Sequence, residues 1–162
     1  MKSVRRVVTG LNGNGDSFFE LDSDLPDLFA GGGMDDFKDQ GALALAEIWQ
    51  GFLPTDNTGD ADSRRQGEPD ANSLMVRIVE FPPEPDGTAK PGEGLDSHPG
   101  FHITDTTDVI IVMEGEIYAM MESEETLLKQ GDVLIQRGTN HAWSNRSGKP
   151  TKIAAIMLST RP

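Results

Sequence analysis

Short apolar runs alternate with glycine-centred turns through the second half of the chain. The glycines between the runs, Gly115, Gly131 and Gly138, are each flanked by polar residues. Runs so short and so often interrupted by glycine are typical of antiparallel barrels and two-sheet jelly rolls. We therefore predict an all-β fold with strands at 101–104, 109–113, 116–121, 126–129, 133–136, 141–144 and 151–158.

The clearest strand of the first half is 72–81, which is stopped by Pro82 and Pro83. Its apolar residues alternate, with Leu74, Val76 and Ile78 on one face and Met75, Arg77, Val79 and Phe81 on the other. Segment 42–52 mixes helix-forming and strand-forming residues, and we predict strand for its second half. Residues 3–9 and 17–21 are predicted to pair as an edge hairpin, and the polar or proline-rich segments are predicted to be loops: 22–41, an exposed and mobile 54–70, and 83–100.

The length of 162 residues indicates one domain, 1–162, with N-terminal strands and loops in 1–82 and the barrel strands in 101–158. The formal net charge of −13 argues against binding to nucleic acid or anionic membranes. Cysteine is absent, and the basic N-terminus is not followed by an apolar signal segment. We therefore expect a soluble, cytoplasmic protein.

Two groups of residues in the second half carry the candidate chemistry. The first comprises His102, Thr104, Asp108 and Gly115; the second comprises Gly131, Gln136, Gly138, His141 and Asn145. These groups resemble the two linked motifs of the cupin superfamily, a His-x-His…Glu…Gly motif and a Gly…Pro-x-Gly-x-x-His-x-x-x-Asn motif. The second match is the more specific, and the resemblance covers 101–158.

The resemblance implies a cupin-like antiparallel β-barrel, a double-stranded β-helix or jelly roll of the single-domain conserved-barrel type, with a divalent metal held inside. It points to His102, Asp108 and His141 as metal ligands. Here Thr104 stands in place of the middle His, and Asp108 stands in place of the usual Glu, so the four-ligand set is altered. Two imidazoles and a carboxylate suit Fe, Zn, Mn or Ni.

Two alternatives need no metal. His102 and His141 can be polar residues of the barrel that are hydrogen-bonded to Thr104, Asp108 or the backbone. Alternatively, His141 can act as a general base, because a neighbouring carboxylate such as Asp108 raises the basicity of an imidazole. His98, beside Pro99, is expected to lie on the surface.

Four residues are expected to line the pocket: Thr104, Gln136, Trp143 and Tyr118. Trp143 shares the strand face of His141 and suits a planar ligand. For Asn145 a structural role is the simpler expectation.

The leading functional hypothesis is a small-molecule enzyme that acts on an organic acid or aromatic metabolite, as an oxygenase, isomerase or decarboxylase if metal is bound. The alternative is a metal-free module that binds or senses a small molecule. The resemblance also implies a homodimer formed through the N-terminal strands, and the loops 54–70 and 83–100 are candidates to close over the pocket.

Overall fold

The computed structural model describes residues 4–25, 29–30 (backbone only), 43–54, 57, 59–64, 67–85 and 98–160. These residues form strands, turns and bends, with no helix among them. Within the described ranges there is accordingly no helix long and apolar enough to cross a membrane. The predicted all-β class is confirmed.

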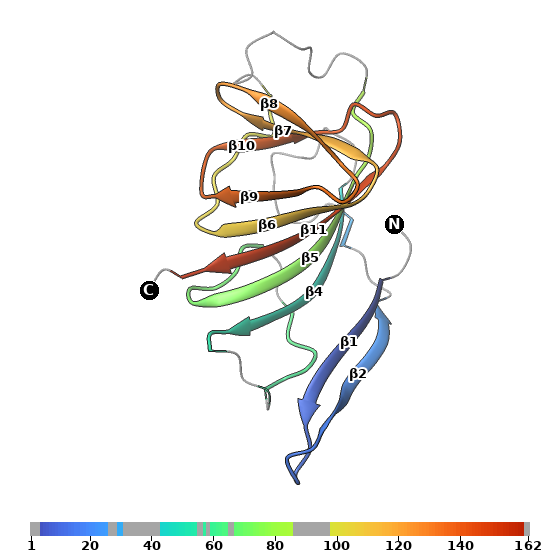
Figure 1. Ribbon diagram of the computed structural model, residues 1–162, viewed down its shortest axis with the longest axis vertical. Helices are drawn as coiled ribbons and strands as arrows, with labels where there is room; N and C mark the ends of the chain where they lie inside the picture. The colour runs from blue at the N-terminus through green and yellow to red at the C-terminus, as the bar shows by residue number, and fades with distance from the viewer. Residues whose placement is uncertain are drawn as a thin grey trace.

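Two antiparallel sheets form the barrel (Figure 1). The smaller sheet has three strands in the order β10 (His141–Ser144), β7 (Glu116–Met121) and β8 (Glu125–Lys129). The larger has six strands, in the order β3 (Phe29–Ala30), β4 (Ala44–Phe52), β5 (Ser73–Phe81), β11 (Thr151–Ser159), β6 (Thr107–Glu114) and β9 (Val133–Arg137).

The hydrophobic core lies between these sheets. The register of β5, β11 and β6 places Val79, Ile153 and Val112 side by side, and Ile117 and Ala119 of β7 belong to the same buried cluster. Because side chains alternate along a strand, the residues between them point to the other face of each sheet. Met75 and Val79 belong to the core cluster, so the face of β5 that carries Met75, Arg77 and Val79 is the interior face.

The tight turn between β6 and β7 depends on Gly115. Its φ of 81° lies in the left-handed region, where glycine has no steric penalty. A Cβ at this position would approach Thr151 Oγ1 to 2.7 Å and Thr151 Cα to 3.2 Å. The glycine therefore permits both the turn and the close approach of β11.

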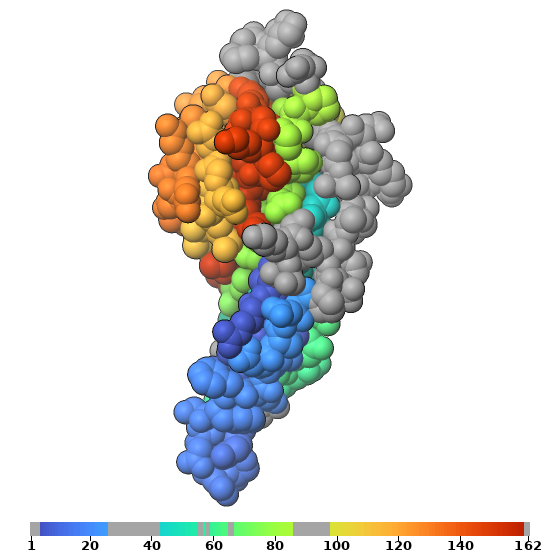
Figure 2. Space-filling model, turned by 90° about the vertical axis from the view of Figure 1, so that its right-hand side faces the viewer, coloured from blue at the N-terminus to red at the C-terminus, as the bar shows by residue number. Residues whose placement is uncertain are grey.

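The N-terminal hairpin forms a sheet of its own from β1 (Val4–Leu11) and β2 (Ser17–Leu25). It projects below the barrel in Figures 1 and 2. Arg5 forms an exposed ion pair with Asp22, whereas Arg6 is buried, donates to the Ile48 carbonyl at 3.1 Å and pairs with Asp62. The predicted hairpin is confirmed, and the burial of Arg6 shows that one side of this hairpin is covered.

Several predicted boundaries change. β2 continues to Leu25, and β4 occupies Ala44–Phe52 rather than only the second half of its segment. The predicted strand at 101–104 is reduced to an isolated bridge at His102. Most of the predicted loop 22–41 and residues 86–97 of the loop 83–100 lie outside the described residues.

Candidate functional site

His102 and His141 are direct cross-strand neighbours. The His102 amide donates to the His141 carbonyl at 2.9 Å, and the His141 amide donates back to the His102 carbonyl at 3.0 Å. This reciprocal pair forms an isolated antiparallel bridge at the start of β10. The two imidazole rings lie 4.3 Å apart between centroids, tilted by 48°. The side chains of His102 and His141, which are 39 positions apart in the sequence, therefore lie side by side.

A backbone carbonyl fixes the orientation of each ring. His102 Nδ1 lies 2.9 Å from the Gly100 oxygen, and His141 Nδ1 lies 2.9 Å from the Thr139 oxygen. Because a carbonyl oxygen only accepts, both Nδ1 atoms carry the proton. In the neutral form of each ring, Nε2 then carries the lone pair. This tautomer is the one in which a histidine binds a metal or accepts a hydrogen bond through Nε2.

His141 is 3% exposed, and burial lowers its pKa from 6.5 to about 4. The hydrogen bond to the Thr139 carbonyl acts in the opposite direction, and His102 contributes a smaller lowering. Asp108 has no part in this shift. The expectation that Asp108 raises the basicity of His141 is therefore wrong, and His141 is neutral at physiological pH.

Asp108 lies on the interior face of β6, opposite Gln136 of β9 and Met157 of β11. It is 3% exposed, and its Oδ1 has no hydrogen-bond partner. Burial raises the pKa of Asp108, while the hydroxyls of Thr106 and Thr104 act to lower it. Thr104, which stands at the position of the middle His in the motif that this segment resembles, is itself buried and accepts a hydrogen bond from Thr106 Oγ1 at 2.9 Å.

The three predicted metal ligands do not gather in this structure. His102 and His141 lie together, but nowhere in the described residues does a group of three His, Asp or Glu side chains meet as a metal site. Asp108 lies near enough to His102 for the charge of the histidine to lower the pKa of Asp108. It does not form a three-residue metal site with the two histidines.

Gln136 supports His141. Its Nε2 donates to the Thr139 carbonyl at 2.8 Å, the same oxygen that accepts from His141 Nδ1. Its Nε2 also lies 2.6 Å from the Thr139 hydroxyl. The side chain therefore orients the acceptor of His141.

Trp143 and Tyr118 lie on opposite faces of the small sheet. Trp143 packs against the core, with its ring edge-on to His141 at 5.8 Å and tilted toward Phe81 at 6.4 Å. Tyr118 alternates with core residues of β7, and the Arg146 guanidinium stacks 4.3 Å above its ring. The prediction that Trp143 shares the face of His141 is supported, whereas Tyr118 does not line the interior.

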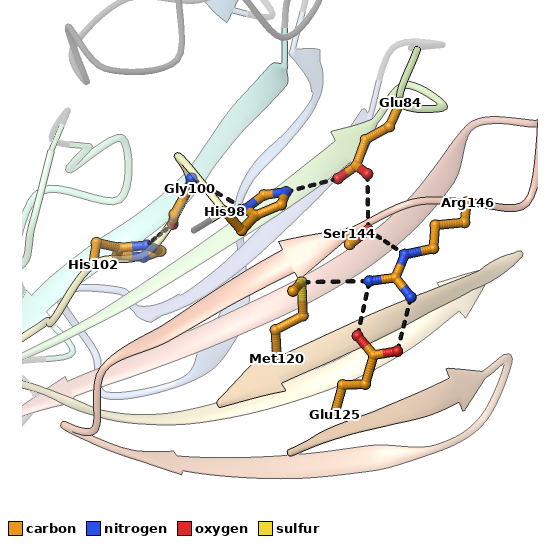
Figure 3. A network of polar contacts seen from close by, with 8 residues as sticks. All are labelled: Glu84, His98, Gly100, His102, Met120, Glu125, Ser144 and Arg146. Atoms are coloured by element: carbon orange, nitrogen blue, oxygen red, sulfur yellow. Dashed lines mark hydrogen bonds and ion pairs between the residues drawn. The ribbon is translucent and has the colours of Figure 1, made fainter. Parts of the chain in front are cut away.

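His98 is buried, with 4% of its surface exposed, so the expectation of a surface position is wrong. Its Nε2 lies 3.1 Å from Glu84 Oε1, and its Nδ1 accepts from the Gly100 amide at 3.1 Å (Figure 3). The adjacent Pro99 gave no indication of this burial, because proline position reports on local backbone and not on tertiary contacts.

A buried ion pair on the large sheet was missed. Arg77 of β5 and Glu47 of β4 are cross-strand partners with a separation of 3.0 Å between Nη2 and Oε1. Arg77 also pairs across with the core residue Ala155 of β11, which places it on the interior face. Burial raises the pKa of Glu47, and the charge of Arg77 opposes that shift. The sequence signal was an arginine on an otherwise apolar strand face.

A hollow of about 230 Å³ opens beside the small sheet. Two of the residues that line this hollow lie next to the histidine site. Met121 is the cross-strand partner of His141, and Ala119 is the cross-strand partner of Trp143. The hollow is lined by Ala119, Met121, Glu124, Glu125, Thr126 and Leu134.

Comparison with known proteins agrees with this architecture. The family described as "Cupin domain" matches residues 87–157. The chain is 32% identical to phomopsin biosynthesis cluster protein C' of Diaporthe leptostromiformis, over 91% of this chain and 73% of that protein. The paired barrel sheets define a cupin fold. The chain belongs to the cupin family.

Two further matches extend the comparison. A protein of Neurospora crassa named as a cupin-domain-containing oxidoreductase is 28% identical, over 97% of this chain and 74% of its own length. The crystal structure of a putative ethanolamine utilization protein from Salmonella typhimurium superposes with a TM-score of 0.50 at 10% identity, covering 99% of this chain and all of that one. This second match supports the double-stranded β-helix fold alone.

Proposed function

We propose that this protein is a small-molecule enzyme of the cupin oxidoreductase type, and that its ligand binds in the barrel against the His102–His141 pair. The single observation that carries the proposal is the pair itself. Both rings are fixed by backbone carbonyls in the tautomer with its lone pair on Nε2. Relatives named as cupin-domain oxidoreductases and biosynthesis cluster proteins support the assignment to small-molecule chemistry.

The site offers a ligand both polar and apolar contacts. The two imidazoles accept hydrogen bonds through Nε2 when neutral. Trp143 presents an apolar ring next to His141. An organic acid that binds in its protonated form, or an aromatic compound with a hydroxyl group, satisfies both kinds of contact. We expect the substrate to come from these classes.

The metal hypothesis fits only in part. Two imidazoles in this tautomer suit Fe, Zn, Mn or Ni, with Asp108 as the proposed third ligand. The described residues do not form a group of three ligands, so they do not fit a complete metal site as they stand.

A metal-free binding module is the second candidate function. It is favoured by Thr104, whose hydroxyl is engaged by Thr106 in the position where the family usually has a His. In this reading the same imidazole pair holds a ligand by hydrogen bonds, and no chemical conversion follows.

A ligand screen with conversion measured afterwards tests both proposals. Thermal unfolding is followed with a panel of small organic acids and phenols, for the wild type, His102→Gln and His141→Gln. Compounds that raise the wild-type unfolding temperature are expected to lose most of that effect in both variants. Trp49→Phe, which changes an aromatic residue of β4 outside the site, is the matched control and should keep the effect.

Each hit is then incubated with the protein in air, with chelator or with added Fe²⁺, Zn²⁺, Mn²⁺ or Ni²⁺, and the products are analysed by mass spectrometry. A mass change that depends on both histidines supports the enzyme. Binding without conversion under every condition supports the module. Hits that are indifferent to both histidine substitutions would contradict both proposals.

A further inference from the structure

His98 contacts the residue that orients His102. The Gly100 amide donates to His98 Nδ1 at 3.1 Å, and the Gly100 carbonyl accepts from His102 Nδ1 at 2.9 Å (Figure 3). Gly100 therefore has a histidine on each of its polar groups. Because an amide N–H only donates, His98 Nδ1 is the acceptor, and the proton of its neutral ring lies on Nε2. That proton is donated to Glu84 Oε1 at 3.1 Å.

The Glu84 carboxylate ties this segment to the strand that carries His141. Its second oxygen accepts from Ser144 Oγ at 2.8 Å, and Ser144 lies on β10, three residues after His141. The Ser144 hydroxyl accepts in turn from Arg146 Nε at 2.9 Å. Figure 3 shows these contacts as one continuous chain from Glu125 to His102.

An ion pair ends this series of contacts on the side of β8. Arg146 forms two parallel hydrogen bonds of 2.8 Å with the two oxygens of Glu125 on β8. Such bidentate pairs fix geometry as well as charge. His98 and Glu84 are also well shielded, with side chains 1% and 9% exposed. A hydrogen bond lost here leaves buried polar groups unsatisfied.

These contacts add to the backbone pairing that holds the segment around His102. Between Gly100 and β6 its only strand-like pairing is the single bridge between His102 and His141. His141, by contrast, begins a strand, and Gln136 holds its acceptor carbonyl at Thr139. The two histidines of the pair thus have matching supports, Gln136 for His141 and His98 for His102.

We propose that His98, anchored by Glu84, is a positioning residue that acts through Gly100 to hold His102 in the Nδ1–H tautomer opposite His141. The inference rests on the proposed role of the histidine pair. It assigns His98 no contact with the ligand. Metal-binding and catalytic histidines generally need the groups that hydrogen-bond to their other ring nitrogen for full affinity or activity.

Long-range ¹H–¹⁵N correlation of imidazole nitrogens tests the proposal directly, because the chain has only three histidines to assign. The wild type is expected to show His98 with its proton on Nε2, and His102 and His141 with theirs on Nδ1. His98 or His102 in the other tautomer would overturn the proposal without any substitution.

Two substitutions separate positioning from packing. His98→Asn places an oxygen near the former Nδ1, which keeps the acceptor for Gly100 but removes the donor to Glu84. His98→Gln places an amide nitrogen near the former Nε2, which keeps the donor but removes the acceptor. We expect His102 to keep its single Nδ1–H form in the Asn variant and to become a mixture of tautomers in the Gln variant.

The same two variants have a functional readout. The affinity of a ligand found in the screen is expected to fall about tenfold in His98→Gln and to remain near the wild-type value in His98→Asn. Thermal unfolding reports any shared loss of stability. Equal tautomer patterns in both variants would overturn the proposal. If the screen yields no ligand, the proposed function fails while the tautomer result still decides the role of His98.

Discussion

His141 makes the stability of the protein depend on pH. Its pKa is about 4 in the folded chain because the ring is buried, whereas an exposed histidine has a pKa near 6.5. Between these values the unfolded chain binds the proton more readily than the folded one. The free energy of unfolding should therefore fall as pH drops from about 6.5 to 4, by up to about 3 kcal/mol. Urea unfolding between pH 7.5 and 4.5 measures this change.

A His141→Gln variant distinguishes the contribution of His141 to this pH dependence from the contributions of neighbouring groups. Asp108, whose pKa is raised by burial, contributes in the opposite direction, since it favours the folded state when protonated. His102 faces His141 directly. Subtracting the profile of His141→Gln from that of the wild type isolates the His141 contribution. Parallel profiles for the two proteins would show that His141 does not carry a lowered pKa.

The candidate site residues that could be predicted from the sequence are those that belong to local sequence motifs. The spacing of the second motif identified His141, and the first motif identified His102. Their pairing through a backbone bridge, and the burial of His98 against Glu84, are set by how distant segments pack. No periodicity in the sequence encodes the contact between His98 and Glu84, so sequence reasoning placed His98 on the surface.

Strands were predictable where alternation and turn glycines agreed. The strands from β6 to β11 were found for this reason. β4 was only half recognised, because its Ala and Leu residues favour helix while pairing with β5 determines the actual structure. The end of β2 was missed because its residues are nearly all exposed and polar, which leaves no hydrophobic pattern to detect.

Asn145 stabilises the loop between β10 and β11. The side chain is 1% exposed; its amide donates to the Phe81 carbonyl at 2.9 Å and to the Lys149 carbonyl at 2.7 Å, and its oxygen accepts from the Ser147 amide and hydroxyl. We predict that Asn145→Ala lowers the free energy of unfolding by about 2–3 kcal/mol, because it leaves buried backbone groups unsatisfied. Urea unfolding measures the loss.

The matched control for this loop is Ser147→Ala. Ser147 is half-buried, and the hydrogen bond from its hydroxyl to the Lys149 carbonyl is exposed, so water can replace that contact. Its removal should cost below about 1 kcal/mol. A cost for Ser147→Ala equal to that for Asn145→Ala would indicate that the loop as a whole, and not the asparagine, provides the stability.

At the level of the whole molecule, the N-terminal hairpin is a separate two-stranded sheet that contacts β4 through Arg6 and projects beyond the barrel (Figure 2). An isolated two-stranded ribbon is marginally stable in water. This one also exposes four apolar side chains, with exposed fractions of 44% for Val7, 40% for Leu11, 43% for Phe18 and 74% for Phe19. Exposed apolar residues on the edge strands of a sheet are typical of surfaces that bind another chain. We propose that this hairpin forms the interface of a homodimer.

Sedimentation equilibrium tests the dimer, which should weigh twice the 17.6 kDa of one chain. The double substitution Phe18→Ser and Phe19→Ser is expected to weaken association about a hundredfold, because two aromatic side chains no longer leave water when the copies meet. Phe52→Ser is the matched control, since Phe52 is 61% exposed on β4 and belongs to the barrel. A wild-type protein that stays monomeric at tens of micromolar concentration would refute the dimer, and equal weakening by Phe52→Ser would place the interface on the barrel instead of the hairpin.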